Sequence, residues 1–345
     1  MKDNDRYWDC LDQAMEASRG GRTDEALAWL EEALRAHPDG AEAHNGRGEI
    51  LWDDGRVDEA LFEFEQAAQA DPKFVAAHLN RAELLIEEFG EHEQALELLD
   101  TLLEGRPELP RLDRAAEAEV HYLKSKALFY LDDLEGALFL VRRAQRAGGD
   151  QAIYRAFEGQ ILFELGRTEE ARRILERAVA MDPESAHAVY HLALVLERLG
   201  ELEEAERAFR QADALDPEHY PEPVRIEDAD FEAAVRESLD NLPRSIRAYV
   251  DPVPVLVEEL PSDELVEAER ISPQILGLYL GVPRTEAAVT EQRSDLDRIY
   301  LFKRNLEKVC RDRTELVEQI QVTVRHEVGH HLGLDEDALA RLGLA

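Results

Sequence analysis

Small and large apolar positions recur along residues 7–218 with a period close to 34 residues. The distance from Pro38 to Pro72 is 34 residues, and the distance from Pro183 to Pro217 is also 34 residues. Because small alanines let two helices approach closely and proline ends the second one, the pattern predicts a series of helix pairs. The repeated apolar positions are Ala26 and Ala33; Ala60, Phe64 and Ala67; Ala171, Leu175 and Ala178; and Ala205, Phe209 and Ala212.

Turn signals separate the two expected helices of each pair, as at Gly55 and Gly200. Two weaker copies of the pattern lie around residues 95–107 and 137–149. Together these features resemble the tetratricopeptide repeat (TPR) family, with about six copies in this chain. The resemblance implies an α-helical solenoid over residues 1–218, with a groove that binds a protein or peptide partner.

The expected first helices of the repeats carry several acidic and amide side chains. An acidic groove would favour a basic partner or substrate, because opposite electrostatic potentials attract. The alternative is that these carboxylates only keep a solvated surface soluble. The side chains are Asn45, Glu49, Asn80, Glu83 and Glu87.

The repeat pattern stops at Tyr220-Pro-Glu-Pro223, because two prolines this close cannot continue a helix. We therefore expect a linker over residues 219–227 and a second domain over residues 228–345. Apolar residues then recur at both helical and strand spacing, which predicts a small α+β domain. Its expected elements are a helix over 228–241, strands at 253–259, 275–280 and 298–302, a helix from Asp312 to about Leu332, and a last short helix from about Asp335.

Composition narrows the possible functions. The formal net charge is −36, and an acidic surface repels phosphate backbones and anionic lipid, so we expect no nucleic-acid binding and no membrane binding. Cys10 and Cys310 are far apart and match no metal-ligand spacing, so no disulfide framework is expected. The first residues lack the apolar run of a signal peptide, and no stretch reaches 18 apolar residues. We therefore expect a cytoplasmic location.

The candidate chemistry lies in His326-Glu-Val-Gly-His330, within the helix expected to begin at Asp312. Side chains four residues apart share one face of a helix, so His326 and His330 can bind one metal ion. Zinc suits two imidazole ligands, at roughly 2.0–2.1 Å. Glu327 is turned away from direct ligation and can accept a proton from a water that the metal activates. The motif therefore predicts a zinc site with Glu327 as general base.

The second domain combines this motif with further segments, namely Phe231-Glu-Ala-Ala-Val, Leu242-Pro, Val255-Leu-Val-Glu-Glu, Gly277-Leu-Tyr-Leu-Gly-Val-Pro283, Ile299-Tyr-Leu-Phe302 and the Gly-His-His-Leu-Gly-Leu that ends the motif. This combination resembles the small bacterial minimal-zincin metallopeptidase family, over about a third of the chain. The resemblance implies a reduced zincin fold with peptidase activity. It also implies that His326 and His330 are zinc ligands and that Glu327 is the base.

A third zinc ligand is expected from Asp335, Glu336 or Asp337, or from residues before the motif. Gly333 lies where the helix must turn to bring such a ligand back. The family's site is of the HExxHxxGxxD type, so the resemblance favours Glu336, which stands where the family typically has Asp. The longer side chain of Glu can still ligate, but the departure leaves Asp335 and Asp337 open. Alternatively, Asp335 only caps the last helix and its neighbours are solvated.

These features predict a zinc-dependent metallopeptidase whose TPR array recruits a protein partner or a peptide substrate. One alternative is a non-catalytic TPR scaffold or adaptor whose zincin-like domain is vestigial or structural. Another is a hydrolase of other bonds, because HExxH does not specify the scissile bond. The strand at 277–280 is a candidate edge for pairing with an extended substrate, and Tyr279, Tyr300 and His331 are candidates to stabilise an oxyanion. Each of these also fits an ordinary core or surface role.

Overall fold

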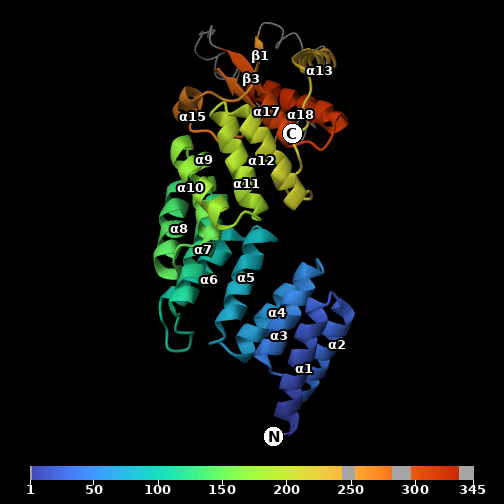
Figure 1. Ribbon diagram of the computed structural model, residues 1–345, viewed down its shortest axis with the longest axis vertical. Coiled ribbons are helices and arrows are strands. Elements are labelled where there is room, and N and C mark those ends of the chain that lie inside the picture. Colours follow the sequence, from blue (N-terminus) through green and yellow to red (C-terminus); the bar gives the residue numbers. More distant parts are fainter. Residues whose placement is uncertain (1, 243–252, 282–296, 334–345) are drawn as a thin grey trace. The chain divides into compact units, whose positions relative to one another are not determined.

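The structure is a computed structural model that describes residues 2–242, 253–281 and 297–333. These residues form sixteen helices and three strands, and the helices dominate (Figure 1). By its internal contacts the chain divides into two compact units, Met1–Ile161 and Leu162–Ala345. This division falls within the repeats. Among the described residues, no helix is both long enough and apolar enough to cross a membrane.

The first unit consists of helices that pack in consecutive pairs: α1 with α2, α3 with α4, α5 with α6, and α7 with α8. This is the helix-pair arrangement that the 34-residue period predicts. The helices are α1 (Lys2–Arg19), α2 (Thr23–Ala36), α3 (Ala41–Asp53), α4 (Val57–Ala70), α5 (Val75–Glu87), α6 (His92–Leu103), α7 (Arg114–Tyr130), α8 (Leu134–Gly148) and α9 (Ala152–Glu164), whose last residues belong to the second unit.

Small residues let the paired helices approach closely. A Cβ atom added to Gly48 of α3 would lie 2.5 Å from Cε1 of Phe64 on α4, closer than real side chains come. Ala26 and Ala60 are completely buried at equivalent positions of α2 and α4. Phe64 thus fills a space that only glycine on the facing helix leaves open, which explains the small-residue positions of the repeat.

The second unit begins with the remaining repeat helices, α10 (Thr168–Met181), α11 (Ala186–Arg198) and α12 (Leu202–Leu215). Helix α11 packs against both α10 and α12. Phe209 and Ala212 of α12 are fully buried, as the repeat pattern predicts. The repeat helices therefore number twelve in all, which corresponds to the expected six TPR copies.

A small three-stranded sheet follows the repeats. Its strands are β1 (Val255–Glu258), β2 (Gly277–Leu280) and β3 (Arg298–Phe302), in the order β1-β3-β2. Strand β1 runs parallel to β3, and β2 runs antiparallel to it with Gly277 opposite Leu301. All three strands lie where the sequence predicts them. The surrounding helices are α13 (Asp228–Asp240), α15 (Asp263–Glu269), α17 (Lys303–Lys308) and α18 (Arg313–His331).

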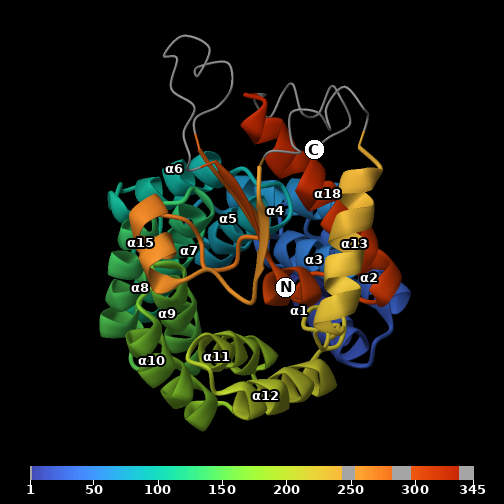
Figure 2. The same ribbon diagram turned by 90° about the horizontal axis from the view of Figure 1, so that it is seen from above.

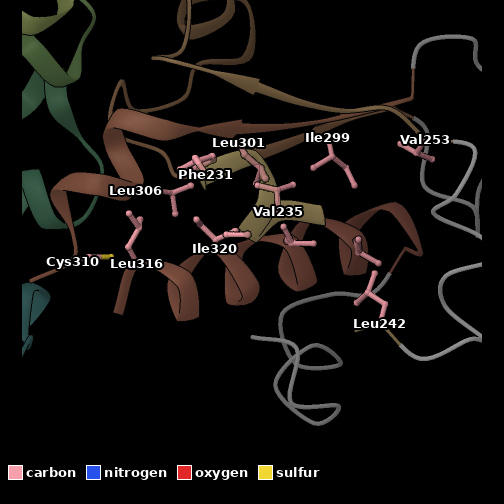
Figure 3. Close-up of a cluster of buried hydrophobic side chains, with 13 residues drawn as sticks. Phe231, Val235, Leu242, Val253, Ile299, Leu301, Leu306, Cys310, Leu316 and Ile320 are labelled. Atoms are coloured by element: carbon pink, nitrogen blue, oxygen red, sulfur yellow. The ribbon is translucent and has the colours of Figure 1, made fainter. Parts of the chain in front are cut away.

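Helices α13 and α18 cover one face of the sheet and lie side by side (Figure 2). The core lies between this helix pair and the strands, as the side chains in Figure 3 show. Helix α18 contributes an apolar residue to this core at every fourth position, and this spacing places these side chains on one side of the helix. Almost completely buried members of the core include Leu316, Ile320, Val324 and Val328 of α18, Ile299 and Leu301 of β3, and Phe231 of α13.

Helix α18 begins with a side-chain cap at Asp312, the residue at which the sequence predicts the helix to start. The side chain of Asp312 accepts hydrogen bonds from the backbone N–H groups of Thr314 (2.7 Å) and Glu315 (3.0 Å). These bonds also lower the pKa of Asp312, because they favour the carboxylate form. The cap and the apolar stripe together fix both the start and the rotation of the helix that carries the histidine motif. The expected short helix from Asp335 lies outside the described residues.

Candidate functional site

His326 and His330 come together on α18. Their Nε2 atoms lie 2.9 Å apart, the ring centroids are 4.5 Å apart, and the ring planes meet at 82°. Because the residues are four positions apart, both rings project from the same side of the helix. The neighbouring stripe that includes Val324 and Val328 faces the core. Burial of that stripe therefore fixes where the two imidazoles point.

The spacing of the two nitrogen atoms suits a shared zinc ion. Tetrahedral coordination with Zn–N bonds of about 2.0–2.1 Å places two ligand nitrogens roughly 3.3 Å apart. The observed 2.9 Å between the Nε2 atoms of His326 and His330 differs from this by only a few tenths of an ångström. A small rotation of either ring would close that difference. Neutral imidazole is also a preferred ligand type for zinc.

The described residues supply no third ligand beside His326 and His330. In the described part of the chain, no group of three or more His, Cys, Asp and Glu side chains could hold a metal ion. The predicted ligand Glu336, with its alternatives Asp335 and Asp337, lies beyond residue 333, outside the described residues. The assignment of Glu336 therefore stays a prediction.

Glu327, the predicted base, is 6% exposed and sits against strand β2. A Cβ atom added to Gly277 would lie 3.0 Å from Cγ and 3.1 Å from Oε1 of Glu327, and 2.8 Å from Cγ2 of Thr323. The start of β2 thus approaches α18 as closely as a glycine allows. Sequence reasoning missed this role of Gly277; a glycine inside a strand was the available signal, because it often marks close backbone approach.

Replacing Gly277 by alanine should displace the Glu327 carboxylate. We expect the zinc-loaded Gly277→Ala protein to cleave peptides about 100-fold more slowly, since a shift of about 1 Å in a reacting group can have that effect. Zinc content should stay unchanged, because the three atoms nearest to the added Cβ belong to Thr323 and Glu327 rather than to either histidine. The matched control is Gly46→Ala, whose added Cβ would lie 3.7 Å from Leu30. Equal kcat/KM values for the two variants would contradict this role.

The structure places two of the candidate oxyanion residues, Tyr279 and Tyr300, on opposite faces of the sheet. Tyr279 is opposite Ile299 in the sheet and packs against the core that α18 covers, so it lies on the same face as Gly277. Burial raises the pKa of Tyr279, and the charge of Asp297 and a hydrogen bond to its carboxylate raise it further, so the phenol stays neutral and donates its hydrogen bond to Asp297. Tyr300 alternates with buried Ile299 along β3 and therefore points to the other face, where it stacks on Phe302. The side chain of His331 lies outside the described residues.

Strand β2 is at an edge of the sheet. Among the described strands it pairs only with β3, because the order is β1-β3-β2. Its residues Gly277–Leu280 are half-buried. An edge strand presents backbone N–H and C=O groups to which an extended chain can add. The position beside Glu327 fits the predicted pairing of this strand with a substrate.

Three of the acidic and amide side chains on the first helices of the repeats are linked by hydrogen bonds. Asn45 donates to Glu49 at 2.8 Å within α3. Asn80 of α5 donates to Asn45 at 3.1 Å and to Glu49 at 2.9 Å. These side chains join successive repeats, in addition to any role in binding.

Farther along the same unit, carboxylates gather around one lysine. Lys126 of α7 forms ion pairs with Glu83 (3.8 Å) and Glu87 (2.5 Å) of α5. Burial raises the pKa of Glu83, and burial together with the charge of Glu83 raises the pKa of Glu119. Lys126 is therefore the cation beside several partly buried carboxylates. A second cation bound near them would stabilise their charged forms.

Comparison with known families confirms the predicted order of the two parts. Residues 250–344 match the family model of zincin-like metallopeptidases. Residues 11–73 and 158–220 match one model of the tetratricopeptide repeat, and residues 51–117 match another. The chain thus carries TPR repeats followed by a C-terminal zincin-like domain. No curated protein gives a significant match to the chain.

Several solved structures share the repeat fold. PilF of Pseudomonas aeruginosa has 16% sequence identity and a TM-score of 0.51, covering 68% of this chain and 99% of its own. PilW, a type IV pilus biogenesis factor, has 18% identity and a TM-score of 0.53, covering 61% and 94%. The Cut9–Hcn1 assembly of the APC/C has 15% identity and a TM-score of 0.51, covering 63% and 44%. At these identities the likeness shows the fold alone.

Proposed function

We propose that the chain is a zinc-dependent metallopeptidase that hydrolyses peptide bonds. The observation that carries the proposal is the pair of imidazole nitrogens on α18, 2.9 Å apart, with the buried carboxylate of Glu327 on the next residue of the same helix. The match of residues 250–344 to zincin-like metallopeptidases supports it. We further propose Glu336 as the third protein ligand.

The chemistry divides between a metal and the protein. A bound zinc ion supplies Lewis-acid chemistry, which polarises the scissile carbonyl and lowers the pKa of a coordinated water to about 7. His326 and His330 would hold the ion through their Nε2 atoms. Glu327 accepts the proton of the attacking water and then delivers it to the leaving amine, as a general base and a general acid do in turn. Gly277 packs against this side chain, which limits the positions that the carboxylate can take.

Strand β2 supports a peptide as the substrate. Among the described strands, none covers its outer edge, which can pair with an extended chain through backbone hydrogen bonds. Pairing of this kind would bring a peptide bond next to Glu327, because Gly277 begins the strand and contacts that side chain. Tyr279 lies on the same face of the sheet, but its neutral phenol donates its hydrogen bond to Asp297, so it would have to exchange that acceptor for the oxyanion in order to stabilise it.

The TPR array is proposed to recruit a protein or peptide rich in basic residues. The half-buried carboxylates of Glu83 and Glu119 have raised pKa values because of burial, so a lysine or arginine from a partner would stabilise their charged forms.

We also propose that the protein acts in the cytoplasm. The two cysteines are buried and free, which suits a reducing compartment.

The proposal is tested by digesting an unbiased peptide library with the zinc-loaded full chain. We expect cleavage products in mass spectra, their loss after treatment with a chelator, and their return after zinc is added back. Zinc-loaded protein that leaves the whole library intact would contradict the proposed activity and favour a non-catalytic scaffold.

A further inference from the structure

The face between the last repeats and the zincin-like region contains a buried ion-pair network that the proposed chemistry does not use. Glu197, near the end of α11, has a side chain only 1% exposed, and all of its described cationic partners lie outside the repeats. Arg225 donates to its Oε1 atom at 2.8 Å, Arg304 of α17 donates to the same atom at 3.3 Å, and Lys308 of α17 pairs with Oε2. A carboxylate buried this deeply is retained only where such partners compensate it.

The linker is part of the same network. Arg225 also donates to Glu307 of α17 at 2.8 Å and to Glu206 of α12 at 2.8 Å. The backbone N–H of Val224 donates to the carbonyl oxygen of Glu307 at 3.0 Å. The linker therefore lies against both the last repeat and α17. The repeats and the zincin-like region share one continuous polar interface at this point.

Two further residues of the repeats contact the loops on either side of α15. Arg198, next to Glu197, donates to the carbonyl oxygen of Pro261 at 3.0 Å and forms an ion pair with Asp263 at 2.7 Å. Glu164, the last residue of α9, accepts a hydrogen bond from the hydroxyl of Ser272 at 2.5 Å. It also accepts a hydrogen bond from the side-chain amide of Gln274.

The Glu164 contact lies just before strand β2. Ser272 and Gln274 belong to the turn that leads into Gly277, and Asn305 of α17 holds the same turn by donating to the carbonyl oxygens of Pro273 (2.9 Å) and Ile275 (2.8 Å). One side of the turn is thus fixed by the repeats and the other by α17. Because Gly277 rests on Glu327, the position of this turn sets the position of β2 beside the candidate base.

We propose that Glu164 is a positioning residue for the site. It holds the turn before β2 from the end of the repeat array, so the repeats are a scaffold for the substrate-binding strand as well as a recruiting surface. This inference rests on the proposed function for its effect on hydrolysis. Its effect on strand β2, however, can be measured by hydrogen exchange, which does not depend on peptide hydrolysis.

The test uses the zinc-loaded full chain with Glu164→Ala and Glu164→Gln. Alanine removes both acceptors. Glutamine can keep both hydrogen bonds, because its carbonyl accepts from Ser272 and the Gln274 amide can turn its oxygen toward the new N–H₂ group. Glu176→Ala is the matched control, since Glu176 is on α10 and pairs with Arg172 of the same helix.

We expect Glu164→Ala to lower kcat/KM at least about tenfold and to speed hydrogen–deuterium exchange in residues 277–280, with zinc content unchanged. Glu164→Gln and Glu176→Ala should stay within about twofold of the parent protein in both measurements. Parent-like exchange at 277–280 in Glu164→Ala, or equal damage in Glu164→Gln, would overturn the inference. A parent protein that exchanges as expected but cleaves nothing would instead count against the proposed function alone.

Discussion

The zinc-loaded Glu327→Gln protein should cleave peptides roughly 100- to 10,000-fold more slowly than the parent chain, which is the usual effect of removing a general base. Glutamine keeps the size of the side chain, so it still fits against Gly277, but its amide cannot accept the proton of the attacking water. The fall should appear mainly in kcat. The measurement is steady-state hydrolysis of a fluorogenic peptide chosen from the library digest.

The control for this change lies on the same helix. Glu318 is an exposed glutamate of α18, and Glu318→Gln removes the same charge without touching the site. We expect it to hydrolyse peptides at the parent rate. Both variants should bind zinc as the parent does, since neither removes a ligand. Undiminished cleavage by Glu327→Gln would exclude this carboxylate as the base.

Removal of one imidazole should remove the metal. We expect His326→Ala to bind zinc at least about 100-fold more weakly than the parent, because changes that only disturb the support of a ligand already cost 10- to 100-fold. Hydrolysis should disappear with the metal. The measurement is equilibrium dialysis against buffered zinc, followed by elemental analysis of the protein.

His219→Ala serves as the comparison for the imidazole change. His219 is exposed, pairs with Asp216 and belongs to the same unit as the site. Its removal should leave the bound zinc unchanged. If His326→Ala retained one zinc per chain at parent affinity, the metal would have to be held elsewhere.

The repeats could be predicted from the sequence because their spacing has a direct physical cause. Close helix pairing demands small residues such as Gly48 opposite a large one such as Phe64, and the same demand returns every 34 residues. The three strands were also predictable, since each is a short apolar run bounded by turn residues. Helix α18 was predicted to begin at Asp312, because Asp is a preferred residue at the start of a helix, and the structure shows its side chain as the cap.

Other features of the structure could not be predicted, because the sequence pattern that marks them is too weak. Helices α15 and α17 have only seven and six residues, which is too short for helical periodicity to stand out. The role of Glu197 was hidden because an acidic residue on a repeat helix normally indicates a solvated face. Its partners Arg304 and Lys308 are more than 100 residues away. Only the fold brings these charges together.

The candidate site was predictable in part. Helical geometry alone places the imidazoles of His326 and His330 together, and the structure gives 2.9 Å between their Nε2 atoms. The close approach of Gly277 to Glu327 depends on the register between β2 and β3, which the sequence does not specify. The proposed ligand Glu336 still rests on spacing and resemblance.

The most direct test of the account is an anomalous difference map, recorded at the zinc absorption edge from crystals of the zinc-loaded full chain. The account predicts one strong peak per chain, at about 2.0–2.1 Å from Nε2 of both His326 and His330. A map with no peak between these two rings, or with zinc bound only at other residues, would contradict it.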